Sequence, residues 1–130
     1  MKSRKSLVRE CDKAFSDFIR ERDGWRCVTC GETDREVLQC GHLFTRAAYS
    51  TRWNLDNCFC QCAACNLRNE YDPYPLTAYF LDRFGREKYD ELHRLHRATV
   101  KFGNDMLQKM IEDFRAKRAE LMLQKAAAWN

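Results

Sequence analysis

Residues 27–66 read CVTCGETDREVLQCGHLFTRAAYSTRWNLDNCFCQCAACN and contain two Cys-x-x-Cys pairs, Cys27/Cys30 and Cys62/Cys65. This spacing lets one tight turn aim two sulfurs at a common point, and two such pairs complete the tetrahedron of a structural zinc site. The first pair lies in a loop and the second at the start of a predicted helix, which is typical of a treble clef. We therefore predict that these four cysteines bind one structural zinc ion.

Four further cysteines lie outside these two pairs. Cys58, Cys60 and Cys62 alternate along a predicted strand, so their side chains share one face of it. Cys60 is therefore an alternative ligand to Cys62, although only Cys62 repeats the spacing of the first pair. The remaining three are expected to be small buried apolar residues: Cys11, Cys40 and Cys58.

The composition is that of an ordered, helix-rich globular chain with one small core. The 130 residues are 45% hydrophobic and 32% charged, with only 5 Gly and 2 Pro, which excludes a disordered or collagen-like chain. No apolar run approaches the roughly 18 residues of a membrane span, and the N-terminus lacks the apolar stretch of a secretory signal. We expect the chain in a reducing cytoplasm and away from membranes, where cysteines bind metal rather than form disulfides.

The net charge indicates little about partners. The formal +4 falls to about +2 once four thiolates bind one zinc, because the sulfurs add −4 and the metal adds +2. Between Val37 and Asn69 the sequence has a single acidic residue, Asp56, and three arginines, Arg46, Arg52 and Arg68. Two interpretations of this local excess are open, a phosphate-binding surface and an ordinary solvated one.

The hydrophobic periodicity predicts an α+β chain of long helices around two short strands. Its three parts are an N-terminal helix within 1–24, a zinc-binding core at 25–72 and C-terminal helices at 73–130. The predicted elements are a helix over 7–22, strands over 37–44 and 57–61 joined by a loop at 45–56, a helix over 63–71, two helices between 76 and 97 separated at Gly85, and a final long helix beginning near 104.

The order of motifs CxxC, GH, N and CxxCN resembles the HNH, or His-Me finger, nucleases in their version with a final Asn. In this chain the order is Cys27/Cys30, Gly41-His42, Asn57 and Cys62/Cys65-Asn66. The segments GHLFTR, RWNLDN and QCAACN, followed by LDRFG and REKYDEL, are more specifically similar to the NinG (Rap) family of phage recombination nucleases, which act on branched DNA. The likeness covers roughly residues 25–95.

The resemblance implies a ββα-metal core flanked by long helices, and it assigns roles to three residues. His42 would be the general base that takes a proton from water, and Asn57 would orient the His strand or ring. Asn66 would donate a side-chain oxygen to a catalytic Mg²⁺ or Mn²⁺. Many HNH enzymes have an Asp directly before the His, where this chain has Gly41, so the second metal ligand stays open among Gln39, Asn69 and Glu70. Glu70 ranks first because it alone is charged.

The expected function is therefore metal-dependent DNA endonuclease activity on branched recombination intermediates, such as a Holliday junction or a flap. Arg46, Arg52 and Arg68 would contact the phosphates beside the scissile bond. A homodimer through the last helix is expected if two strands are cut, and the resemblance places the protein in the cytoplasm of a host bacterium. Two alternatives stay open: a zinc-dependent nucleic-acid-binding module that does not cut, and a general nicking HNH endonuclease.

Overall fold

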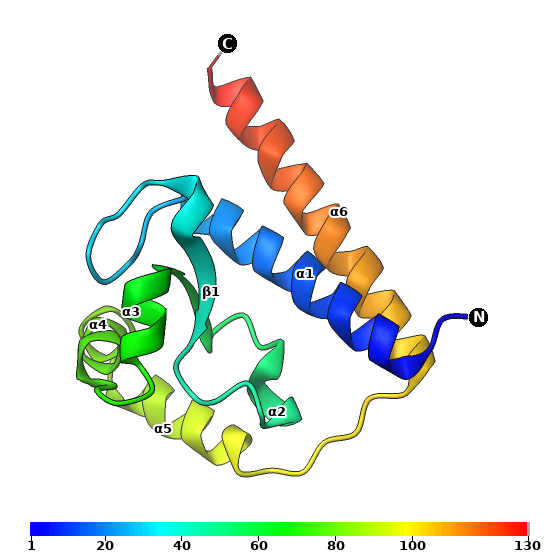
Figure 1. Ribbon diagram of the computed structural model, residues 1–130, viewed down its shortest axis with the longest axis horizontal. Helices are drawn as coiled ribbons and strands as arrows, with labels where there is room; N and C mark the ends of the chain where they lie inside the picture. Colours follow the sequence, from blue (N-terminus) through cyan, green and yellow to red (C-terminus); the bar gives the residue numbers. More distant parts are fainter. Residues whose placement is uncertain (130) are drawn as a thin grey trace.

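The computed structural model describes residues 1–129, and Asn130, the last residue of the predicted domain, lies outside them. The fold is α+β: a two-stranded antiparallel sheet lies between a pair of long helices and a group of three shorter ones (Figure 1). Strand β1 (Leu38–His42) pairs with β2 (Cys58–Cys62) in a register that runs from Leu38 opposite Cys62 to His42 opposite Cys58. Both predicted strands exist, with β1 shorter than expected and β2 displaced by one residue.

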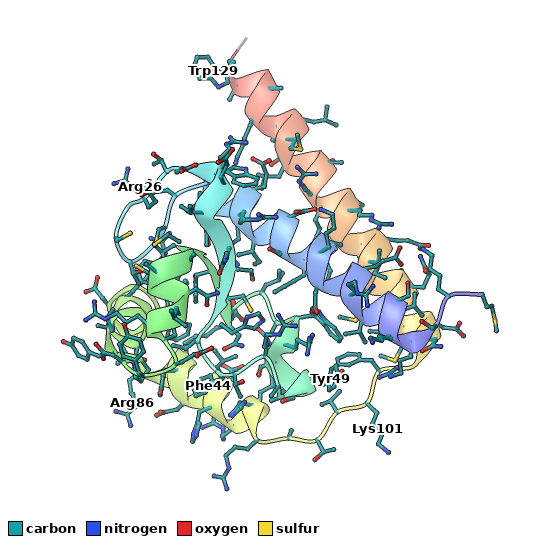
Figure 2. All side chains as sticks on the ribbon, in the orientation of Figure 1. Arg26, Phe44, Tyr49, Arg86, Lys101 and Trp129 are labelled. Carbon is teal, nitrogen blue, oxygen red and sulfur yellow. The ribbon has the colours of Figure 1, made fainter. Side chains whose placement is uncertain are left out.

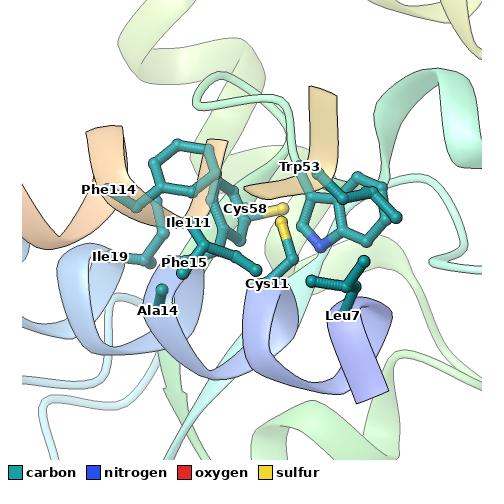
Figure 3. Packing of buried hydrophobic residues seen from close by; sticks show 10 residues of the cluster. Leu7, Cys11, Ala14, Phe15, Ile19, Trp53, Cys58, Ile111 and Phe114 are labelled. Carbon is teal, nitrogen blue, oxygen red and sulfur yellow. The ribbon is translucent and has the colours of Figure 1, made fainter. Parts of the chain in front are cut away.

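The two long helices are α1 (Arg4–Arg22) and α6 (Asn104–Ala128), which lie side by side although they are at opposite ends of the sequence (Figure 1). The hydroxyl of Ser3 accepts a hydrogen bond from the amide of Ser6 and so caps the start of α1. The apolar residues of α1 recur at helical spacing and meet those of α6 in the main core. Figure 3 shows this core, whose members include Leu7, Cys11, Phe15, Ile19, Trp53, Cys58, Ile111 and Phe114.

The shorter helices lie on the opposite side of the sheet. They are α3 (Ala63–Arg68), α4 (Tyr74–Phe84) and α5 (Arg86–His96), and α4 and α5 meet at Gly85, whose φ of +87° favours glycine. The helix predicted to reach residue 71 ends at Arg68, before the Asp72-Pro73 break. A second core, formed by Phe59, Leu76, Phe80 and Leu92, fills the space between β2 and these helices.

Two short elements were not predicted. A 3-10 helix, η1 (Arg35–Val37), leads into β1, and α2 (Tyr49–Arg52) lies within the segment that was expected to be a plain loop. The ring of Phe44, labelled in Figure 2, lies against the rings of Tyr89 and His96 on α5, at 5.3 and 5.0 Å between centroids. The segment between the strands is therefore packed at its start. Across residues 1–129, no helix has both the length and the apolar character that crossing a membrane requires.

Candidate functional site

The two Cys-x-x-Cys pairs converge on one point. The sulfurs of Cys27, Cys30, Cys62 and Cys65 all lie within 4.8 Å of one another, and those of Cys30 and Cys62 are 3.7 Å apart. A tetrahedral site with Zn–S bonds of about 2.3 Å places its sulfurs about 3.8 Å apart, so this donor set fits a structural zinc ion. Cys60 is buried in a small cluster with Cys27, Leu38 and Cys62, but its sulfur lies outside the group of four, which favours Cys62 over the alternative ligand.

Backbone hydrogen bonds shape the loop that carries the first pair. The amide of Cys27 donates to the carbonyl of Glu32, and the amide of Val28 donates to the carbonyl of Cys60 on β2, at 2.8 and 2.9 Å. Burial raises the pKa of the Cys27 thiol, but the Thr29 hydroxyl at 3.3 Å and nearby backbone amides outweigh it and lower the pKa to about 6. The loop therefore favours the thiolate at Cys27, which is the form that binds zinc. At Cys30 a backbone hydrogen bond from Glu32 lowers the pKa, but burial and the neighbouring cysteine sulfurs outweigh it and raise the pKa of the thiol.

A cleft of about 760 Å³ lies beside this cluster, along β1 and α3. Three of the residues singled out in the sequence line it, namely His42, Asn66 and Glu70, together with two of the alternative metal ligands, Gln39 and Asn69. Arg46 is also on its wall. Asn57 and two of the three arginines, Arg52 and Arg68, do not line it. The cleft thus brings together four of the seven predicted site residues that are not zinc ligands, namely His42, Asn66, Glu70 and Arg46.

His42 is held in one orientation. Its Nε2 lies 2.9 Å from the carbonyl oxygen of Arg52, and because a carbonyl accepts, Nε2 carries the proton. Nδ1 is then the basic nitrogen of the ring. Burial lowers the pKa of His42 below its ordinary value of 6.5, and the charges of Arg46 and Arg52 act in the same direction, against the hydrogen bond to Arg52 and the charge of Asp12. The imidazole is therefore neutral at pH 7.

Asn57 is fully buried and holds two segments that follow His42 in the chain. Its Oδ1 accepts from the amide of Phe44 at 2.8 Å, and its Nδ2 donates to the carbonyls of Phe44 and Thr51 at 3.0 Å each. The first two bonds hold the segment that follows His42, and the third holds α2, whose last residue is Arg52. The side chain is a support for the histidine rather than part of the cleft wall.

The oxygen donors of the cleft fit a hard cation in part. The Nδ2 of Asn66 donates to the Oε1 of Gln39 at 2.9 Å, and the Oδ1 of Asn66 has no hydrogen bond within residues 1–129. The Nδ2 of Asn69 donates to the Oε1 of Gln61 at 2.6 Å, and its Oδ1 likewise has no hydrogen bond within residues 1–129. The cleft therefore offers one carboxylate, Glu70, and two free amide oxygens, a set to which Mg²⁺ would add water and substrate oxygens.

The three arginines differ in what they can reach. The guanidinium of Arg52 makes a two-pronged ion pair with Asp12, at 2.9 and 2.6 Å, and its side chain is only 11% exposed, so its role is structural. Arg68 is paired with Asp72 away from the cleft. Arg46 lies 3.4 Å from Asp12 with a side chain that is 63% exposed, which leaves it as the arginine available to a ligand in the cleft.

Sequence reasoning missed two features around His42. The carboxylate of Asp12, on α1, binds Arg52 and also accepts from Nε1 of Trp53 at 2.9 Å, across 40 and 41 residues of sequence. The ligand atoms of Cys40, His42 and Cys58 lie within 4.8 Å of one another, because Cys58 faces His42 in the strand register. Burial raises the pKa of the Cys58 thiol well above its ordinary value, and that thiol lies 3.8 Å from the carbonyl of Arg52. The alternation of Cys58, Cys60 and Cys62 was the one available signal.

A protein-family model described as NinG, Bacteriophage Lambda NinG protein, matches residues 1–124 of the chain. Among curated proteins, the protein named ninG of Escherichia phage lambda is 31% identical in an alignment 128 positions long, which covers 92% of this chain and 63% of that protein. The proteins of the same name from Escherichia phage 933W and Salmonella phage P22 are each 30% identical over 92% of this chain. The chain thus spans less than two thirds of the length of these relatives, and no solved structure matches it.

Proposed function

The chain belongs to the NinG family, and on this basis we propose that it is a metal-dependent endonuclease that hydrolyses phosphodiester bonds in DNA, with His42 as the general base. The observation that carries the proposal is the hydrogen bond between Nε2 of His42 and the carbonyl of Arg52. Because Nε2 is occupied as a donor, Nδ1 is left as the basic nitrogen of a neutral histidine on the wall of a cleft.

The proposed reaction uses groups that line this cleft. Nδ1 of His42 accepts a proton from water, the water oxygen forms a bond to phosphorus, and the bond from phosphorus to the 3′ oxygen breaks. The leaving oxygen takes a proton from solvent. The exposed guanidinium of Arg46 is the cation on the cleft wall that can bind a non-bridging phosphate oxygen.

The proposed catalytic cation is Mg²⁺ or Mn²⁺, held by Asn66 and Glu70. When bound, it would stabilise the negative charge that develops on the phosphate and on the leaving oxygen. The chain's own residues hold these oxygen ligands in place. Gln39 accepts a hydrogen bond from Nδ2 of Asn66 and thereby fixes the orientation of the Asn66 amide and of its free oxygen. The cysteine cluster has a separate role, since Cys62 and Cys65 anchor the start of α3, which carries Asn66.

Branched DNA as the preferred substrate rests on the resemblance of residues 25–95 to recombination nucleases. Cutting a four-way junction on two strands requires two active sites, so this proposal includes two copies of the chain acting together. The predicted contact, the last helix, exposes Met122 and Leu123 in its second half. Light scattering of the protein bound to a junction tests this part, and a strict monomer would contradict paired cleavage.

The proposed activity is tested by incubating the zinc-loaded chain with a four-way junction, a flap and a plain duplex, each with Mg²⁺, with Mn²⁺ or with EDTA. His42→Gln is the informative variant because glutamine keeps a donor for the Arg52 carbonyl but has no basic nitrogen. We expect it to lower the cleavage rate by about a hundredfold or more. The matched control is His93→Gln, at an exposed position on α5.

Three outcomes are decisive. Loss of cleavage in His42→Gln with retained zinc and retained activity in His93→Gln supports the proposal. Binding without products in any metal favours a zinc-dependent nucleic-acid-binding module instead. Equal cutting of the plain duplex and the junction favours a general nicking enzyme.

A further inference from the structure

We propose that Asp12, on α1, is a positioning residue that holds the ring of His42 through Arg52 and Trp53. The inference rests on the proposed function, because positioning matters for activity only if His42 is the base. No motif points to Asp12, which lies 30 residues before His42 and outside the segment that resembles HNH nucleases. Its contacts alone indicate the role.

Asp12 fixes two consecutive residues at once. One carboxylate oxygen, Oδ1, accepts from Nε of Arg52 and from Nε1 of Trp53, at 2.9 Å each, and the other, Oδ2, accepts from Nη2 of Arg52 at 2.6 Å. The two anchored side chains belong to the last residue of α2 and to the residue after it. Since both are tied to the same carboxylate, the peptide that joins them has little freedom to rotate.

That peptide carries the carbonyl that orients His42. The oxygen of Arg52 accepts from Nε2 of His42 at 2.9 Å, so a rotation of the peptide would remove the acceptor from the ring. The helix around it cannot supply rigidity, because α2 has four residues and no side-chain cap. Two other anchors, Thr51 to Asn57 and Ser50 to the carbonyl of His96, act on earlier residues. The peptide itself is also held by the amide of Trp53, which donates to the carbonyl of Thr51, and by the Cys58 thiol, 3.8 Å from the Arg52 carbonyl.

Asp12 is also held in its charged form. Burial would raise the pKa of its carboxyl, but the hydrogen bonds and charge of Arg52, with the hydrogen bond from Trp53, keep the pKa below its ordinary value of 3.8. The carboxylate is therefore present at pH 7, where His42 is neutral. Figure 3 shows Trp53 in the main core beside α1, the helix from which Asp12 projects, so both ends of the connection rest on packed structure.

Three variants separate position from stability. Asp12→Ala removes both acceptors and leaves the charges of Arg52 and Arg46 without their acidic partner, which is itself destabilising. Asp12→Asn keeps one acceptor oxygen. The double variant Asp12→Ala/Arg52→Met removes the more buried of the two stranded charges but leaves the Arg52 carbonyl in the chain, so it separates loss of the anchor from the cost of that charge. Glu10→Ala is the matched control, since Glu10 lies on the same helix and pairs with Lys2 alone.

The first readout is the tautomer of His42, measured from the ring ¹⁵N shifts of the full zinc-loaded chain. The chain has three histidines, and His42→Gln assigns the signal. We expect the Nε2-protonated form in the wild type and in Glu10→Ala, and a mixture of tautomers in Asp12→Ala and in the double variant, with Asp12→Asn between them. An unchanged tautomer in the double variant would overturn the inference.

The second readout is cleavage of the junction. We expect kcat to fall about tenfold to a hundredfold in Asp12→Ala and in the double variant, with KM nearly unchanged and partial recovery in Asp12→Asn. An unchanged kcat in the double variant would also overturn the inference. The two proposals fail in different ways, because absence of cleavage by the wild type refutes the endonuclease, whereas the tautomer measurement requires no activity.

Discussion

Gly41 lies directly against the side chain of Gln61: a Cβ at position 41 would be 1.9 Å from the Oε1 of Gln61. Gln61 cannot easily move away, because its Nε2 donates to Thr29 and its Oε1 accepts from Asn69. The residue before His42 is therefore a glycine for steric reasons.

Gly41→Ala is expected to lower the free energy of unfolding by about 1–3 kcal/mol, because Gln61 must give up its hydrogen bonds to make room. Urea denaturation measures the change. Shortening the partner in Gly41→Ala/Gln61→Ala should restore part of the loss. A neutral Gly41→Ala would show that Gln61 is not fixed as described.

Metal analysis is expected to find one zinc per chain. Cys65→Ser should lose the zinc and with it several kcal/mol of stability, because the metal joins the first loop to the start of α3. Cys60→Ala should keep the zinc, since Cys60 lies outside the group of four sulfurs. Mass spectrometry of the native protein and thermal melting with a chelator check both statements, and zinc loss in Cys60→Ala would contradict the ligand set.

The pH dependence of cleavage should follow His42. Its pKa lies below 6.5 in the folded chain, chiefly because of burial, so the base is lost only as the pH falls below that value. The acidic limb of kcat/KM is therefore expected below pH 6.5. Stability follows the same sign: the unfolded chain takes up the proton first, so His42 lowers stability as the pH falls through 6.5 toward the folded pKa. A limb centred above pH 6.5 would exclude His42 as the titrating base.

Arg46→Ala is expected to weaken binding to all DNA forms alike and to reduce the slope of log affinity against log salt by about one, as expected for one lost phosphate contact. Fluorescence anisotropy at several salt concentrations measures both effects. Arg86→Ala is the control, because Arg86 is also exposed but lies at the start of α5, away from the cleft. Equal effects of the two substitutions would contradict a specific role for Arg46.

The features that could be predicted from the sequence are those with a local signal. The Cys-x-x-Cys spacing identified the four cysteines that converge, and hydrophobic periodicity located the strands and the long helices. The short helix α2 gave no such signal, because a single turn has no periodicity and is held by tertiary contacts instead. Its position within the predicted loop was missed for that reason.

The surroundings of His42 could not be predicted, because they are made by contacts between distant residues. The carbonyl that orients the ring belongs to the backbone of Arg52, and every residue type has such a group. The ion pair between Asp12 and Arg52 joins residues 40 positions apart. It explains why Arg52, which was expected to contact a DNA phosphate, instead binds a carboxylate within the protein. Counting charges along the sequence identifies the cationic residues, but it does not show which of them already have an ion-pair partner in the fold.

Strand β2 sends Cys58 into the core of α1 and α6 and the next residue, Phe59, into the core of α4 and α5. Strand β2 therefore borders both cores, and loss of either core would expose one face of its five residues. Of the three parts expected from the sequence, 1–24 and 73–130 consequently share their cores with residues of 25–72, and only 25–72 also has a small buried cluster of its own, formed by Cys27, Leu38, Cys60 and Cys62. Deleting α6 should therefore unfold the hairpin that carries His42 as well as the helix pair.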